Sequence, residues 1–125
     1  MKSGLYICKC YWMNSRTKEM YPVLKFGMTT NIDTRMYHYN KNGDKYKLLA
    51  FLPCSVKYLK ERERYFKEYS YFSDWCRISR SEHIEYDKGY FKKMYSDLKE
   101  ASDIKITLKS FKNQRGSIVK SLLFE

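Results

Sequence analysis

An apolar run that stops at a glycine and is followed by helix-capping residues occupies positions 24–35 of the sequence. Leu24–Phe26 is typical of a strand, and Gly27 supplies a permissive backbone at which the strand can end. The polar residues at 29–31 can each cap a helix. Arg35 then lies one turn inside that helix, next to the sheet. A guanidinium fixed there suits a phosphate, because a fork of donors and a helix N-terminus both favour an anion.

Two tripeptides flank this region. Gly4-Leu5-Tyr6 opens an earlier strand, and Lys25-Phe26-Gly27 precedes Arg35 by eight residues. The pattern resembles the GIY-YIG nuclease family, in which two antiparallel strands carry the tripeptides and the next helix carries an arginine at this offset. Leu5 stands in place of isoleucine, and Lys25 in place of tyrosine. Lysine there is similar to a subgroup found mainly in phages, large DNA viruses and mobile elements. The resemblance covers roughly residues 3–100.

The resemblance implies a set of catalytic residues. Tyr6 would be the general base on water, and Arg35 would stabilise the attacked phosphate. Tyr39 stands where the family has a histidine or a tyrosine, so its hydroxyl could bond to the phosphate or the water. Lowering a tyrosine pKa from ~10 to ~7 takes about 4 kcal/mol, and one cation shifts a pKa by only about 1–3 units. We therefore expect Lys25 or a metal ion to assist Arg35.

The family's metal-binding carboxylate is matched by Glu82. Two bulky residues follow it, and Asp87, a plausible helix cap, comes five positions later. Glu85 is the alternative, because it is the next carboxylate along the same segment; a structural role for both also stays open. The resemblance implies one Mg²⁺ or Mn²⁺ on Glu82, a hard cation that suits carboxylate and phosphate oxygens. Glu63, near the apolar edge of its helix, is expected to form a surface ion pair instead.

The composition favours a polyanionic partner. The chain has 125 residues, a net charge of +11 and 13 tyrosines. A domain so basic suits DNA, and tyrosine can offer a hydroxyl to phosphate or a ring to a base. No stretch approaches the apolar length of a membrane span and no signal-peptide pattern opens the chain, so we expect an intracellular protein. The cysteines lack a Cys-x-x-Cys spacing, which favours reduced, packed thiols over a zinc site.

The pattern of elements predicts an α+β fold. We expect a three-stranded antiparallel sheet from residues 4–11, 23–27 and 46–54, with the third strand central or well covered. Helices are expected at 32–40, 56–72 and from Asp87 to about residue 100. Residues 1–101 would form the nuclease-like domain. Residues 102–125 would form an extension with a strand at 102–111 and a helix after Ser117, which could complete the core, bind DNA or form a homodimer surface.

Three readings remain in view at this point. The first is a metal-dependent endonuclease that hydrolyses DNA phosphodiester bonds. The second is a catalytically inactive DNA-binding or regulatory module on the same fold, which would bind DNA in a salt-sensitive manner without cleaving it. An interaction or structural protein whose charge serves solubility is a third reading. The presence of Tyr6, Arg35 and Glu82 together favours the nuclease.

Overall fold

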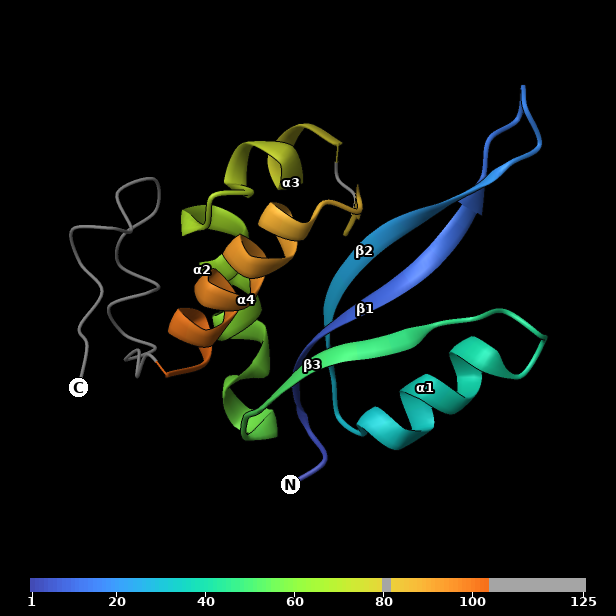
Figure 1. Cartoon of the computed structure of the whole chain (residues 1–125). Coiled ribbons are helices and arrows are strands. Elements are labelled where there is room, and N and C mark those ends of the chain that lie inside the picture. The colour runs from blue at the N-terminus through green and yellow to red at the C-terminus, as the bar shows by residue number, and fades with distance from the viewer. Residues whose placement is uncertain (80–81, 104–125) are drawn as a thin grey trace.

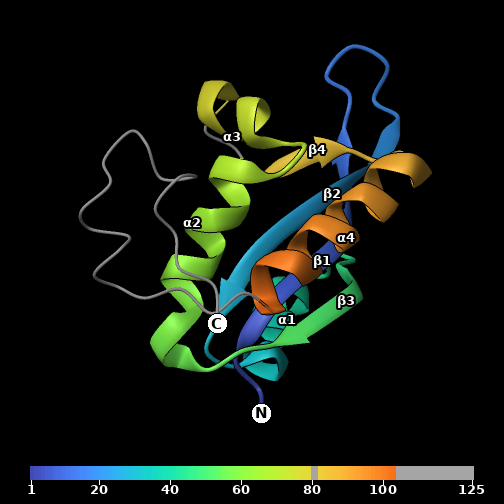
Figure 2. The same cartoon turned by 90° about the vertical axis from the view of Figure 1, so that its left-hand side faces the viewer.

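The computed structural model describes residues 1–79 and 82–103. Its centre is a four-stranded antiparallel sheet in the order β3-β1-β2-β4. The strands are β1 (Gly4–Met13), β2 (Met20–Thr29), β3 (Lys47–Pro53) and β4 (His83–Glu85). The helices are α1 (Ile32–Asn40), a 3-10 turn η1 (Val56–Tyr58), α2 (Leu59–Tyr69), α3 (Ser73–Ser79) and α4 (Lys88–Asp103). Figures 1 and 2 show α1 on one face of the sheet and α2 and α4 on the other.

The two faces of β1 enter two different hydrophobic clusters because successive side chains of a strand point to opposite sides. Leu5 and Ile7 are buried in the main core beneath α2 and α4, where Phe26 of β2 packs on Phe66 with ring centroids 4.7 Å apart. Tyr6 and Cys8 face the other way. They form a smaller cluster with residues of α1, of β3 and of the segment just before β3, namely Ile32, Met36, Tyr39, Phe51 and Tyr46.

The expected three-stranded sheet is wrong in one respect, because β4 adds a fourth strand. β4 has only three residues, and so short a segment carries no readable hydrophobic alternation. The third strand was also expected at a central or well-covered position, yet β3 lies at an edge of the sheet and its apolar residues are only partly buried. An edge position explains how Pro53 can be part of the strand, since an edge tolerates a missing backbone donor.

The helical layer differs from expectation at both ends. The single helix predicted over 56–72 is a 3-10 turn followed by α2, and α3 was not foreseen. Ser102 and Asp103 are the last residues of α4 rather than the start of a strand. The remainder of the predicted C-terminal strand and helix lies outside the described residues. None of the helices within 1–79 and 82–103 is both long and apolar enough to cross a lipid bilayer.

One of the three candidate caps at 29–31 caps α1, and the predicted cap at Asp87 is confirmed. The side chain of Asn31 accepts a hydrogen bond from the backbone N–H of Thr34 at the start of α1, and this helix has the bounds expected from the sequence. The carboxylate of Asp87 accepts from the N–H groups of Gly89 and Tyr90 at the start of α4. These two caps fix where α1 begins after β2 and where α4 begins after β4.

Gly4 lies where β1 approaches β3 closely. A Cβ added at Gly4 would meet the carbonyl carbon of Leu52 and the ring of Phe51, each at 2.9 Å. Replacing Gly4 with alanine should therefore lower the free energy of unfolding by about 1–3 kcal/mol, because the methyl group forces the strands apart. Urea unfolding followed by circular dichroism measures the change.

Gly43 provides the matched control. Its φ of +86° favours glycine, but no atom lies within 4 Å of an added Cβ. Asparagine tolerates this backbone region, so Gly43→Asn should cost less than about 1 kcal/mol. Equal stability of Gly4→Ala and the wild-type protein would contradict the close approach of β1 to β3.

Candidate active site

Tyr6 lies across the face of β2 at the one position where that strand has no side chain. In the register of β1 with β2, Tyr6 is paired with Gly27. A Cβ at Gly27 would lie 2.8 Å from the Tyr6 hydroxyl oxygen and 3.0 Å from the ring carbon that carries it. β2 continues to Thr29, so the prediction that the strand stops at Gly27 is wrong. Glycine is needed here for space beneath the phenol.

The hydroxyl of Tyr6 is hydrogen-bonded to the hydroxyl of Tyr39, with the two oxygens 2.6 Å apart. Either oxygen can be the donor. The Tyr39 ring stacks on Tyr46 at a centroid distance of 4.4 Å, which holds it in place. Arg35 lies one turn earlier on α1, and its guanidinium carbon is 6.0 Å from the Tyr39 ring centroid. Helix α1 therefore brings both Tyr39 and Arg35 to the phenol of β1.

The pKa of Tyr6 is raised well above its ordinary value. Burial is the largest cause, since only 1% of the residue is exposed, and the hydrogen bond and charge of Tyr39 raise the pKa further. The positive charge of Arg35 lowers the pKa, but by less than these effects raise it. Tyr6 is thus a neutral phenol in the free protein. This agrees with the expectation that Arg35 alone does not suffice to make it a base.

Lys25 and Glu82 form an ion pair with the Lys25 Nζ 3.3 Å from Glu82 Oε1. The pairing of β2 with β4 explains their meeting: Lys25 is paired with His83, and the backbone N–H of Phe26 donates to the carbonyl of Glu82 at 3.1 Å. Only 9% of Lys25 is exposed, so its charge is held in the protein rather than in bulk water. The sequence placed both residues in the site but did not reveal this contact.

A second lysine reaches Glu82 from α2, on the opposite face of the sheet. The Nζ of Lys67 is 3.4 Å from Glu82 Oε2 and 3.4 Å from Glu63 Oε1. Burial raises the pKa of Glu63, and Lys67 opposes that rise. The expected ion pair of Glu63 is confirmed, although the Glu63 side chain is only 14% exposed. Lys67 was missed; the i, i+4 spacing to Glu63 was its sequence signal.

Tyr6 and Lys25 share one face of the β-hairpin, and Glu82, just before the edge strand β4, is reached by Lys25 from that face and by Lys67 of α2. Cys8 is paired with Lys25 while Tyr6 is paired with Gly27, so Tyr6 and Lys25 are diagonal neighbours. Such neighbours lie roughly 7–8 Å apart. Cys8 stands between them, and its thiol pKa is raised to about 12 by burial although the Lys25 charge lowers it. The structure thus forms two contact groups, Tyr6–Tyr39–Arg35 and Lys25–Glu82, and strand pairing makes Tyr6 of the first a diagonal neighbour of Lys25 of the second.

Glu85, the alternative metal ligand, lies further along the sheet. It is exposed, is paired with Val23 in β4 and lines a hollow beside the loop that joins β1 to β2. Glu82 is the carboxylate that directly contacts Lys25, the diagonal neighbour of Tyr6. The geometry therefore favours Glu82 over Glu85 as the carboxylate that acts with the phenol.

Glu82 is the carboxylate of this site that contacts Lys25, and the Glu63 carboxylate lies on the other side of Lys67. Within residues 1–79 and 82–103, no group of three or more His, Cys, Asp and Glu side chains is placed to hold a metal. Mg²⁺ usually keeps several waters and is bound through one or two carboxylates together with substrate phosphates. Glu82 fits that mode, in which the phosphate completes the site. The described cysteines are free thiols, as the sequence predicted, and three of the four are buried.

No protein-family model, no curated protein and no solved structure significantly matches this chain. The assignment of a function therefore depends on the residues of the site and their geometry.

The buried state of Tyr6 makes a prediction about stability at alkaline pH. The pKa of Tyr6 is higher in the folded protein than in the unfolded chain, so the unfolded chain releases the proton first. The contribution of Tyr6 to the free energy of unfolding is therefore fully present below pH ~10 and is lost as the pH rises further. The free energy of unfolding of the wild-type protein should therefore fall relative to Tyr6→Phe by about 1.4 kcal/mol for each pH unit above ~10.

Urea unfolding between pH 8 and pH 11.5 measures this difference. Tyr37→Phe, which removes a tyrosine from the exposed side of the same helix that carries Tyr39, controls for the loss of a phenol as such. A wild-type minus Tyr6→Phe difference that does not change with pH would show that Tyr6 is not buried as described.

Proposed function

We propose that this chain is a metal-dependent endonuclease of the GIY-YIG type that hydrolyses DNA phosphodiester bonds. The observation that carries the proposal is the strand register that sets the Tyr6–Tyr39 hydrogen bond, with Arg35 beside it, diagonally next to Lys25 and its ion pair with Glu82. Hydrolysis of a phosphodiester needs a base for water, cationic donors for the charge that develops on phosphorus, and help for the leaving oxygen. A net charge of +11 suits the polyanionic substrate.

Arg35 is the group that would meet the phosphate. It is exposed, and it lies near the N-terminal end of α1. Its planar fork of donors matches two phosphate oxygens at once, and such charge-assisted hydrogen bonds strengthen as negative charge builds in the transition state. Tyr39 is half-buried and is the outer member of the phenol pair, so its hydroxyl is next to the position of that phosphate.

Tyr6 would accept the proton of the attacking water. Its high pKa opposes this role in the free protein, and two features of the site reduce the opposition. The Tyr39 hydrogen bond raises the Tyr6 pKa in the free protein, so it would help only after the substrate has bound, with Tyr39 as the donor and the Tyr6 oxygen as the acceptor. The remaining requirement is positive charge, which Arg35 supplies in part and Lys25, two positions away on the facing strand, can increase.

Glu82 would hold the Mg²⁺ or Mn²⁺ ion together with the bound phosphate. When bound, the ion would polarise the phosphate and stabilise the leaving 3′ oxygen. By analogy with the GIY-YIG family, the products would carry 5′-phosphate and 3′-hydroxyl ends. In the free protein, Lys25 and Lys67 each contact one carboxylate oxygen of Glu82. A DNA phosphate offers these lysines another anion, so we expect metal and DNA to bind cooperatively.

The second candidate function is a catalytically inactive DNA-binding module. The buried neutral state of Tyr6 and the occupation of both Glu82 oxygens by lysines favour it, because neither group is then free to act on a substrate. The two proposals differ in one outcome: both predict salt-sensitive DNA binding, and only the first predicts metal-dependent cleavage.

Cleavage of plasmid and branched DNA with Mg²⁺ or Mn²⁺ tests the proposal. Tyr6→Phe, Arg35→Ala and Glu82→Ala should each lower the cleavage rate by about 10²-fold or more, the typical loss when a general base or a charge-stabilising donor is removed. Glu85→Ala is the matched control and should cleave at nearly the wild-type rate. Cleavage that survives all three changes would refute the mechanism, and DNA binding without any cleavage would support the inactive module.

A further inference from the structure

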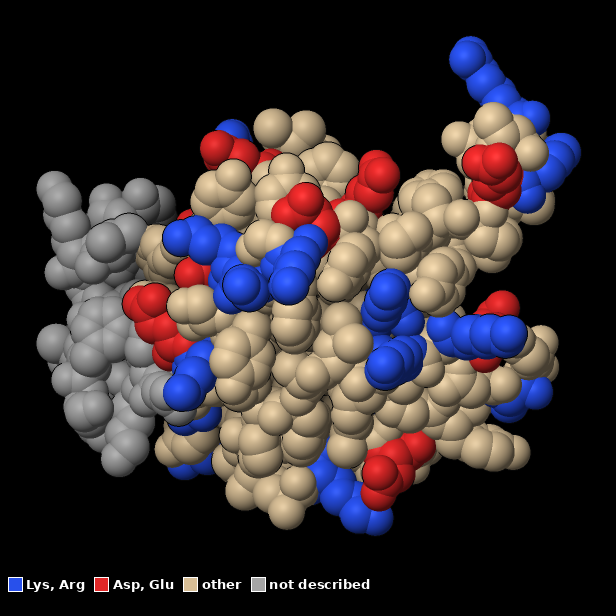
Figure 3. Space-filling model, viewed as in Figure 1, with Lys and Arg blue, Asp and Glu red and all other residues tan. Residues whose placement is uncertain are grey.

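The ends of β1 and β2 extend beyond the body of the molecule as a two-stranded arm. We call residues 11–22, with the loop between the strands, the hairpin arm. Figures 1 and 3 show it standing clear of the helices, with basic side chains at its end. Much of its apolar surface is exposed: Met13 and Met20 are a cross-strand pair and are 55% and 60% exposed. Because the arm is so exposed, it contributes little to the core, and the stability of the core does not explain its length.

The loop at the end of the arm is held in one conformation by Asn14. Its side-chain oxygen accepts hydrogen bonds from the backbone N–H groups of Arg16 and Thr17, at 2.9 and 3.1 Å. Its backbone N–H donates to the carbonyl of Glu19 and its carbonyl accepts from the N–H of Lys18, both at 2.8 Å. A loop ordered in this way loses little conformational entropy when it binds a partner.

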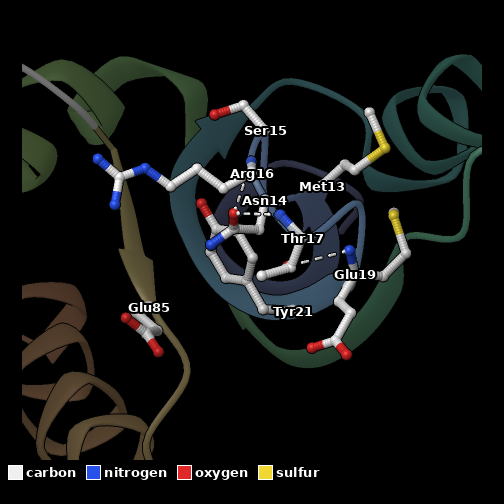
Figure 4. Close-up of a pocket in the computed structure, with 9 residues that line it drawn as sticks. Met13, Asn14, Ser15, Arg16, Thr17, Glu19, Tyr21 and Glu85 are labelled. Carbon is white, nitrogen blue, oxygen red and sulfur yellow. Dashed lines mark hydrogen bonds between the residues drawn. The ribbon is translucent and has the colours of Figure 1, made fainter.

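Lys18 occupies a backbone conformation that does not suit a lysine. Its φ is +62°, in the left-handed region that favours glycine or asparagine. Arg16 and Lys18 are both exposed, and neither forms an ion pair in the part of the chain that the structure describes. Figure 4 shows the Arg16 side chain extended away from the loop. A lysine kept at a position better suited to glycine points to a use for its charge.

The arm continues the face of the sheet that carries the candidate site. Alternation along β1 places Trp12 on the same face as Tyr6. The Trp12 ring is 42% exposed and lies 4.8 Å from the ring of His83, whose strand partner is Lys25. Glu19 and Glu85 are the acidic side chains of the hollow beside the loop (Figure 4). Arg16 also lines that hollow, and Arg16 and Lys18 are the two basic residues of the arm, whose charge suits phosphate.

We propose that the hairpin arm lies along a groove of the same DNA duplex whose phosphate is at Tyr6, with Arg16 and Lys18 on phosphates some distance away. This inference rests on the proposed function and adds to it the part of the substrate that the arm contacts. A major groove admits a two-stranded ribbon. From Tyr6 to Met13 the strand rises about 23 Å at ~3.3 Å per residue, and the loop adds to this. At 3.4 Å per base pair, the contacts fall roughly seven or eight base pairs from the cleaved bond.

The test measures binding in the absence of metal, with Tyr6→Phe as the background so that no cleavage intervenes. The probe is a fluorescent duplex of about 24 base pairs, long enough to contact the site and the arm together on the reach estimated above. Its affinity is followed by anisotropy between 50 and 200 mM salt. Arg16→Ser with Lys18→Gly should reduce the slope of log affinity against log salt by about 1.8, which is about a tenfold change across this range.

A charge-matched control is Lys57→Ser with Lys60→Ser, two exposed lysines at η1 and the start of α2. If the slope of log affinity against log salt were the same for the arm variant and for the Lys57→Ser, Lys60→Ser control, the proposal would be overturned. The single change Lys18→Gly should lower the slope by about 0.9 while the Tm stays level or rises, because glycine relieves the left-handed backbone. A loss of binding accompanied by a lower Tm would also overturn it.

Cleavage assays on the chain with Tyr6 intact separate this inference from the proposed function. Arm-dependent binding without any cleavage would support the inference and refute the nuclease. These assays also vary the length of duplex on either side of the cleaved bond. If the arm changes leave the cleavage rate unaffected at every such length, the result would support the nuclease and refute the inference.

Discussion

The register of β1 with β2 is the constraint on which the rest of the site depends. It pairs Tyr6 with Gly27 and Cys8 with Lys25, which places the phenol over the only empty position of β2 and the lysine diagonally beside it. A slip of one residue would turn every side chain of the strand to the opposite face. The burial of Leu5 and Ile7 in the main core opposes such a slip, so the packing of one face fixes the chemistry of the other.

The site combines a buried neutral phenol with a carboxylate already paired to two lysines. If the proposed function holds, neither group is in its reactive state in the free protein, and both would change state when an anion binds. A phosphate beside Arg35 would draw lysine charge away from Glu82, and the cation that then joins Glu82 would favour ionisation of Tyr6. On this account the substrate and the metal complete the site together, which would keep the free protein inactive.

The sequence predicted the parts of the fold that carry strong local signals. The bounds of α1 followed from Asn31 and the cap of α4 followed from Asp87, because each cap depends on residues next to it in the chain. β4 was missed because three residues show no periodicity, and the edge position of β3 was missed because an apolar run does not show which neighbours cover it. The steric role of Gly27 was missed because it depends on a side chain 21 residues away.

The candidate residues also came from the sequence, while their contacts came only from the structure. Lys25 and Glu82 are 57 residues apart, and no local pattern shows that β2 pairs with β4. The measurement that most directly tests whether the two contact groups act on one phosphate is a double-mutant cycle on single-turnover cleavage with Tyr6→Phe and Glu82→Ala. If the two residues act as a unit, the cleavage rate of the double variant should fall no further than that of the slower single variant, to within about tenfold, and we predict this result. Losses that multiply as independent factors would contradict a shared site.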